Sequence, residues 1–253
     1  MNNPTSLIYP IVNVIVTALF AGVVLRQYLQ RHRVYQLYWS IALTMAFVAT
    51  LAYVCMVVVG PTSAAGVALF RLYYVLGAAL MAAWLGLGSL ALVTKPNIAR
   101  LCLIVLSLLS VLAIVLIATA KVDMKALSQV AGKAGADVLE SGAWLPTLIV
   151  LNSLGLLAVA GVAVYSGWKL YRRQSSMSGF RTSNLLWANV LILIGASLIG
   201  AAGSLARLGL QNTFWLIMAF GWCVFFVGVL LASRRTVSAD SASQQASRRT
   251  ARA

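Results

Sequence analysis

The chain has 253 residues, of which 62% are hydrophobic and only 9% are charged, and its formal net charge is +15. A typical soluble domain carries about 25% charged residues, and a chain of this length cannot hide so much apolar surface from water. The composition therefore excludes a soluble globular protein and predicts a membrane protein.

Seven apolar runs follow one another, and each is long enough for a bilayer-crossing helix, which takes about 20 residues. We predict an all-α, polytopic domain with seven transmembrane helices over residues 1–233. Residues 234–253 are rich in Ser, Ala and Arg and have little to bury, so we predict a disordered basic cytoplasmic tail there. The predicted spans are 6–25, 35–59, 67–93, 99–120, 145–168, 184–206 and 213–233.

The basic residues predict the orientation of the chain. If the N-terminus lies outside, most of the 19 Lys and Arg residues fall on inner segments, and the outer side holds only Arg71, Lys121, Lys125, Lys133 and Arg207. Because the side rich in Lys and Arg is cytoplasmic, we predict an N-out, C-in topology. The positive charge then indicates attraction to anionic lipid at the inner face, and no nucleic-acid partner is needed to explain it.

Arg71 lies near the start of the third span, and the sequence after it is uncharged as far as Lys95. At 1.5 Å per residue, Arg71 lies about 14 Å from the middle of the span, close to the hydrocarbon half-thickness of about 15 Å. We therefore place Arg71 at the outer boundary, where its guanidinium can reach the headgroups. Trp84 lies near the middle of the same span.

Small residues recur at four-residue intervals in the third and sixth spans. Such stripes let helix backbones approach closely where lipid provides no hydrophobic push, so we expect both spans to lie inside the bundle. The stripes are Ala78, Ala82 and Gly86 in the third span and Ala196, Gly200 and Ser204 in the sixth.

The long outer loop, residues 121–143, has apolar residues at helical spacing. Two structures remain open for it, which are a short interfacial helix over the bundle and an irregular loop. Gly132 and Gly135 argue against one continuous helix. The spaced apolar residues are Met124, Leu127, Val130, Ala134 and Val138.

The sixth span ends near Arg207, about 18 Å from its middle, and Trp222 lies near the middle of the seventh. Asn13, Asn152, Tyr53 and Tyr74 lie at a depth similar to that of the two arginines. If they all face inward, they form an outward-opening pocket with two positive corners. Arginine binds planar oxyanions through two parallel hydrogen bonds, so such a pocket fits a carboxylate, a phosphate or a lipid headgroup.

Trp84 and Trp222 would then form the apolar floor of this pocket. The alternative remains open that both tryptophans only pack. In that case the arginines anchor the chain to headgroups, and the polar side chains satisfy hydrogen bonds between helices.

Several chemistries lack the residues they need. Asp and Glu do not occur within the predicted spans, which argues against proton- or cation-coupled transport. The last span has no lysine for a retinal Schiff base. The single histidine, His32, and three cysteines without metal-ligand spacing predict no metal site, and we expect neither a cofactor nor an enzyme activity.

Two segments carry a resemblance, namely RLYYVLGAALMAAWLGLGSLALV (71–93) and NVLILIGASLIGAAGSLARLG (189–209). They resemble a group of uncharacterised seven-helix integral membrane proteins of bacteria. The chain is also similar, more loosely, to the seven-helix sensor regions of bacterial signalling kinases. The resemblance implies a multi-pass protein of the bacterial cytoplasmic (plasma) membrane, and it carries over no functional residues, since the group has no assigned activity.

We therefore expect a non-enzymatic, sensor-like or accessory protein that binds a lipid or a small anionic amphiphile from the outer side. Its expected partners are membrane lipids and a further membrane protein. Two alternatives stay open, which are a facilitator-type transporter of small solutes built on a parallel 3+1+3 helix repeat and a structural subunit of a membrane complex.

Overall fold

The computed structural model describes residues 7–173 and 180–250, with side chains described as far as Ala232 except at 170, 171, 173 and 180–185. Within these residues the chain is all-α and contains seven helices long and apolar enough to cross a membrane. The predicted fold class is thus confirmed.

Most ends of the long helices lie close to the predicted boundaries, because these boundaries lie where the apolar run meets polar or helix-breaking residues. The larger departures, at the ends of the first and last helices, are described below. Two short helical segments, α6 (Met124–Ser128) and η4 (Gln211–Thr213), lie in connections. The third span consists of α3 (Ala64–Tyr73), the π-helical segment η2 (Tyr74–Leu80) and α4 (Met81–Val93). The other spans lie in α1 (Ile8–Arg31), α2 (Val34–Val59), α5 (Pro96–Thr119), α7 (Trp144–Arg173), α8 (Phe180–Arg207) and α9 (Phe214–Thr250).

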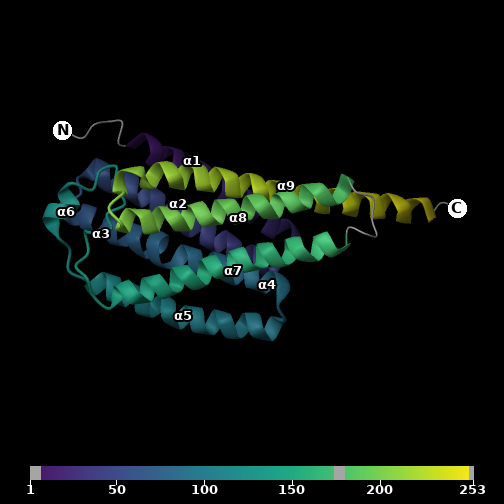
Figure 1. The fold of residues 1–253 in the computed structure, drawn as a ribbon, viewed down its shortest axis with the longest axis horizontal. Helices are drawn as coiled ribbons and strands as arrows, with labels where there is room; N and C mark the ends of the chain where they lie inside the picture. The colour runs from purple at the N-terminus through teal and green to yellow at the C-terminus, as the bar shows by residue number, and fades with distance from the viewer. Residues whose placement is uncertain (1–6, 174–179, 251–253) are drawn as a thin grey trace.

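The long helices lie side by side along the long axis of the molecule, and α6 lies across one end of them (Figure 1). Six spans close a ring through the neighbouring pairs α1–α2, α2–α4, α4–α7, α7–α8, α8–α9 and α9–α1. Helix α5 lies outside this ring, against η2, α4 and α7. The ring matters for function because it encloses the space described below.

The first connection is shorter than the predicted one, 26–34. Helix α1 continues through Arg31, and only His32 and Arg33 separate it from α2. His32 has φ 47°, a left-handed conformation that ends the helix sharply. The helix extends past the apolar run because Arg31 in its last turn interacts favourably with the negative end of the helix dipole.

The third span contains a π-helical segment that the sequence did not predict. Residues Tyr74–Leu80 form it, and in such a segment the backbone bonds from i to i+5 instead of i+4. A π-helical segment holds more residues per turn than an α-helix, so it changes the direction in which every later side chain of the span points.

The α6 loop, residues 121–143, combines the two structures left open for it. Five residues form α6, which Asp123 caps by accepting hydrogen bonds from the amides of Lys125 (2.8 Å) and Ala126 (3.1 Å). The rest of the loop is irregular, and Gly132 and Gly135 adopt positive φ angles of 82° and 71° that end helical structure. Even so, the spaced apolar residues Leu127, Val130, Ala134 and Val138 are buried.

Helix α9 continues to Thr250 and so includes residues 234–250, where the sequence predicts disorder. Side chains 233–253 lie outside the described ones. The cytoplasmic location and disorder of this tail stay predictions.

Candidate ligand cavity

An elongated cavity of about 260 Å³ lies inside the ring of helices. Residues of α2, the third span, α7, α8 and α9 line it, together with two alanines of the α6 loop. Its lining on α8 runs from Arg207 at the α6 end to Ala196, about 17 Å along the helix. Typical small-molecule sites measure about 300–1,000 Å³, so this cavity suits a slender ligand.

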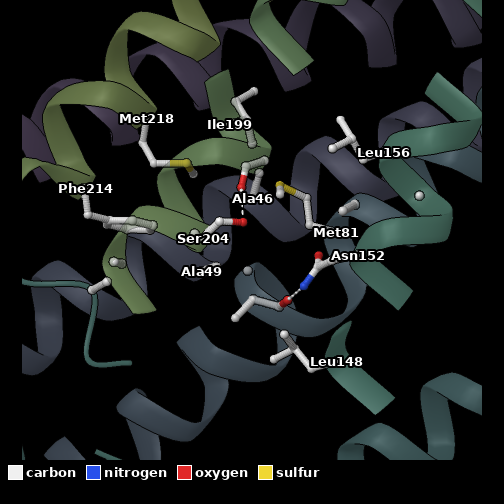
Figure 2. A pocket seen from close by; sticks show the side chains of 18 of the residues that line it. Ala46, Ala49, Met81, Leu148, Asn152, Leu156, Ile199, Ser204, Phe214 and Met218 are labelled. Carbon is white, nitrogen blue, oxygen red and sulfur yellow. Dashed lines mark hydrogen bonds between the residues drawn. The ribbon is translucent and has the colours of Figure 1, made fainter. Parts of the chain in front are cut away.

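The cavity exists because small residues meet where larger ones would fill the ring. Figure 2 shows Ala46 and Ala49 of α2 on its wall, and Gly77 and Ala78 of η2 line it as well. The predicted stripe Ala196, Gly200 and Ser204 of α8 also faces it. The stripe therefore borders the cavity and does not only bring helices into contact. The expectation that this span lies inside the bundle is wrong, because Trp187, Val190 and Ile194 of α8 are exposed.

The end of the cavity away from α6 is apolar. Leu85, Val159, Met218 and Trp222 line it, and the side chain of Trp222 is fully buried. Its Nε1–H has no hydrogen-bond partner among the described residues, and a buried donor without a partner costs about 1–3 kcal/mol. A molecule in the cavity can supply the missing acceptor.

Asn152 supplies a polar contact halfway along the cavity. Its Nδ2 donates to the carbonyl oxygen of Ala78 at 2.6 Å, across the gap between α7 and η2 (Figure 2). A carbonyl oxygen can accept two hydrogen bonds, so this one can add to the backbone bonding of the π-helical segment. Asn152 thereby fixes α7 against the third span at the cavity wall.

Arg207 lies at the α6 end of the cavity and is exposed. Its Nη2 donates to the hydroxyl of Tyr74 at 3.4 Å, and its Cζ lies 5.7 Å from the centroid of the Trp144 ring. Both partners are uncharged, so these contacts orient the guanidinium and leave its positive charge available to an anion.

A second cavity of about 210 Å³ adjoins the first at Arg207. Asp137 of the α6 loop, Trp144 and Gln211 also line it. The guanidinium thus stands between an apolar space within the helices and a polar space at the end of the bundle. This arrangement is suited to a ligand with one charged end and one apolar end.

The structure brings together four of the predicted site residues. Arg207, Tyr74, Asn152 and Trp222 all line the 260 Å³ cavity. They occupy its two ends and its middle in the order that the sequence analysis expected, with the charge at one end and the tryptophan at the other.

Three other predicted residues lie elsewhere. Arg71 donates from Nη2 to the carbonyl oxygen of Ala120 at 3.1 Å, so it ties α3 to the end of α5. Trp84 donates to Ser110 Oγ at 3.2 Å and likewise faces α5. The geometry therefore corrects the expected pocket. Among the described residues, Arg207 is the one arginine that lines it, and its tryptophans are Trp222 and Trp215, without Trp84.

Asn13 also lies outside the cavity. It is fully buried and donates to the carbonyl oxygens of Tyr9 (2.8 Å) and Trp215 (3.0 Å). Asn13 thus links α1 to α9 behind the cavity wall, and this is the interhelical hydrogen bond that the sequence left open as an alternative.

Three aromatic residues hold the α6 loop on the bundle, a role that the sequence did not indicate. One of them, Tyr53, was predicted beside the arginines and does not line the cavity. The Tyr53 hydroxyl shares its one hydrogen between the carbonyl oxygens of Val130 (2.8 Å) and Lys133 (2.9 Å), and the Tyr73 hydroxyl donates to the carbonyl oxygen of Ala134 (3.1 Å). Trp215 Nε1 adds a bond to Lys133 O at 3.2 Å. The burial pattern of the loop was visible in its spacing, but its partners lie far away in sequence.

No family model, curated protein or solved structure matches the chain. The resemblance to seven-helix bacterial membrane proteins therefore stays a prediction. At the coarser level, seven apolar helices make the chain a multi-pass integral membrane protein.

Proposed function

We propose that the chain is a non-enzymatic binding protein of the bacterial cytoplasmic membrane, sensor-like or accessory to another membrane protein. Its ligand is a slender anionic amphiphile with one charged head and one apolar chain. With the N-terminus outside, the α6 end faces outward, so the ligand binds in the outer half of the membrane.

The observation that carries this proposal is the position of Arg207 at one end of an otherwise mostly apolar cavity. The guanidinium binds the carboxylate or phosphate of the head, assisted by the Tyr74 hydroxyl. The apolar chain extends toward Trp222 and Leu85, where Met81 and Met218 adapt to its shape.

The reach of the cavity favours binding over transport. Its lining among the described residues ends at the level of Leu85, Val159 and Ala196. The side chain of Asn189, where a transport path would continue, does not line it. A cavity open toward one end fits a receptor better than it fits a facilitator, which needs access from both sides.

Native mass spectrometry with lipidomics on gently purified protein tests the proposal. We expect one anionic amphiphile per chain in the wild type and its loss in Arg207→Ala. Arg71→Ala is the matched control, because it removes the same charge from a residue that the structure places outside the cavity.

Equal retention of the amphiphile by all three proteins would show that the arginines act only as headgroup anchors. Loss from Arg71→Ala alone would also contradict the proposal, because it would place the site beside α5.

A further inference from the structure

We propose that the ligand reaches the cavity sideways from the bilayer, through an opening between α7 and α8 near the α6 end. The ligand is then a membrane-dissolved amphiphile, and a water-soluble anion does not reach the cavity by this route. This inference rests on the proposed function, because it concerns the same cavity. We call the opening the α7–α8 portal; Ile149 and Ser153 of α7 and Gly203, Ser204 and Arg207 of α8 form it.

The α6 loop covers the cavity toward the end of the bundle, except beside Arg207, where the second cavity adjoins it. Its buried residues Leu127, Val130 and Val138 lie on the helices, and its carbonyl oxygens accept the bonds from Tyr53 and Tyr73 described above. A path from water through the loop itself would require these contacts to break. A path through the second cavity leads past the charged Arg207 and polar side chains, which an apolar chain would have to cross first.

Tight backbone contacts close the walls between the other helices. A Cβ built on Gly86 of α4 would lie 2.8 Å from the Cα of Gly155 in α7, which shows that these backbones touch. A Cβ on Gly195 of α8 would lie 2.6 Å from the Cβ of Phe225 in α9, and one on Gly77 would lie 3.0 Å from the Cβ of Ala49 in α2. At these levels the seams leave no room for a chain to pass.

Helix α1 covers the remaining side, between α9 and α2. Asn13 donates to Trp215 O at 3.0 Å, and the hydroxyls of Thr17 and Thr50 lie 3.4 Å apart. Because Thr50 lines the cavity, these contacts close it directly on that side.

The seam between α7 and α8 is different, because it is tight at one level and open at the next. A Cβ on Gly200 would lie 2.8 Å from Leu156 Cδ2, so the helices touch there. About one turn closer to the α6 end, a Cβ on Gly203 would meet no atom within 4 Å. Ile149, Ser153, Gly203 and Ser204 line the cavity and are nevertheless exposed, so the cavity reaches the surface between them.

The position of the portal fits an amphiphile that moves out of a leaflet. Arg207 lies about 6 Å beyond Gly203 along α8, which allows a head to stay at the guanidinium while the chain passes between the helices. The outward faces of α7 and α8 carry exposed apolar residues, including Leu154, Leu157 and Ile194, so lipid tails surround the opening.

A photolabelling time course tests this route. The probe is palmitic acid carrying a diazirine on its chain, added to phosphatidylcholine vesicles that contain the full chain. Flashes at successive times attach the probe, and peptide mass spectrometry locates it at cavity residues such as Met81 and Met218.

Gly203→Phe narrows the portal without displacing an atom near its Cβ, and Gly161→Phe on α7 is the matched control, because its Cβ also meets nothing within 4 Å. Tyr53→Phe/Tyr73→Phe loosens the α6 loop. We expect Gly203→Phe to label the cavity about tenfold more slowly than the wild type, which corresponds to a barrier raised by about 1.4 kcal/mol. Gly161→Phe and Tyr53→Phe/Tyr73→Phe are expected to be labelled at the wild-type rate. Ser153→Phe narrows the portal from α7 and is expected to be labelled as slowly as Gly203→Phe.

A wild-type rate in both portal variants would overturn sideways access and leave the proposed function standing. Faster labelling in the loop variant alone would also overturn it, in favour of access through the α6 end. A wild type labelled only on its lipid-facing side chains, and nowhere in the cavity, would overturn the proposed function itself.

Discussion

Asn152 links α7 to the third span where that span leaves α-helical bonding. Its amide donates to the carbonyl oxygen of Ala78 at 2.6 Å, in the π-helical segment. A hydrogen bond between helices in a membrane protein adds both stability and a fixed rotation of one helix against the other. Asn152 thus shapes the cavity wall even before a ligand binds.

Asn152→Ala is expected to lower stability by about 1 kcal/mol, the usual net value of one hydrogen bond. For a chain of this size, such a change lowers the melting temperature by about 2–4 °C. Thermal unfolding in detergent measures it, with the neighbouring exposed residue as control in Ser153→Ala. Equal melting temperatures for wild type and Asn152→Ala would show that the bond contributes nothing.

Arg71 and Arg207 show how far two similar residues can differ in surroundings. Arg71 donates to the carbonyl oxygen of Ala120 at the end of α5. Arg207 lies at the cavity, between Tyr74 and Trp144. Only the second has both an apolar space beside it and uncharged partners. This difference makes Arg207 the residue on which the binding proposal depends.

Helices α4 and α7 pack backbone to backbone at Gly86 and Gly155. A side chain on Gly155 would meet the backbone of Ala82, which cannot move aside as a flexible side chain can. Gly161, less than two turns further along α7, faces open space. The same helix thus carries one glycine that is needed for packing and one that is not.

Gly155→Ala is expected to destabilise the protein by about 2–3 kcal/mol, as overpacking in a tight interior does. Gly161→Ala should leave stability unchanged or raise it slightly, because alanine favours helix over glycine by up to about 1 kcal/mol. Thermal unfolding of the two variants side by side measures this difference. Equal effects would contradict the close contact between α4 and α7.

The sequence predicted the elements well, since apolar length alone defines a membrane span. The direction of individual side chains was harder. The sequence leaves Trp84 either at the floor of the pocket or packed between helices, and in the structure it faces Ser110 of α5. The π-helical segment Tyr74–Leu80 lies between Arg71 and Trp84, and a projection at 3.6 residues per turn does not include the rotation that it adds.

The small residues that border the cavity can be recognised in the sequence, but their spacing indicates contact between helices and not a cavity. By its four-residue spacing, the stripe Ala196, Gly200 and Ser204 predicts close contact between helices. In the structure Gly200 does so against Leu156, while Ala196 and Ser204 border open space. Small residues permit either outcome, and only the positions of the facing side chains decide between contact and cavity.

At the scale of the whole molecule, the start of α1 and the end of α9 lie at opposite ends of the bundle (Figure 1). The α6 loop lies at the same end as the start of α1, so one orientation places the loop, Arg207 and the second cavity all outside. We expect this N-out, C-in orientation from the many basic residues at the other end.

Cysteine labelling in intact cells measures the orientation. With Cys223→Ala as background, a membrane-impermeant maleimide should label Lys125→Cys in α6 directly. The same reagent should label Arg33→Cys, between α1 and α2, only after the cells are made permeable. The reverse pattern would place the cavity at the cytoplasmic face and would contradict the proposed outer side.

The central claim is that the space between Arg207 and Trp222 holds the apolar chain of an amphiphile. Ala196 is buried and lines this space, whereas Ala201 on the same helix is exposed and does not. Ala196→Phe and Ala201→Phe therefore add the same ring inside and outside the cavity.

The most direct measurement is the number of palmitate molecules bound per chain, by native mass spectrometry, in the wild type and these two variants. We predict one molecule in the wild type and in Ala201→Phe, and none in Ala196→Phe, with all three proteins shown to be folded by thermal unfolding. Binding of palmitate by folded Ala196→Phe at the wild-type level would contradict the account.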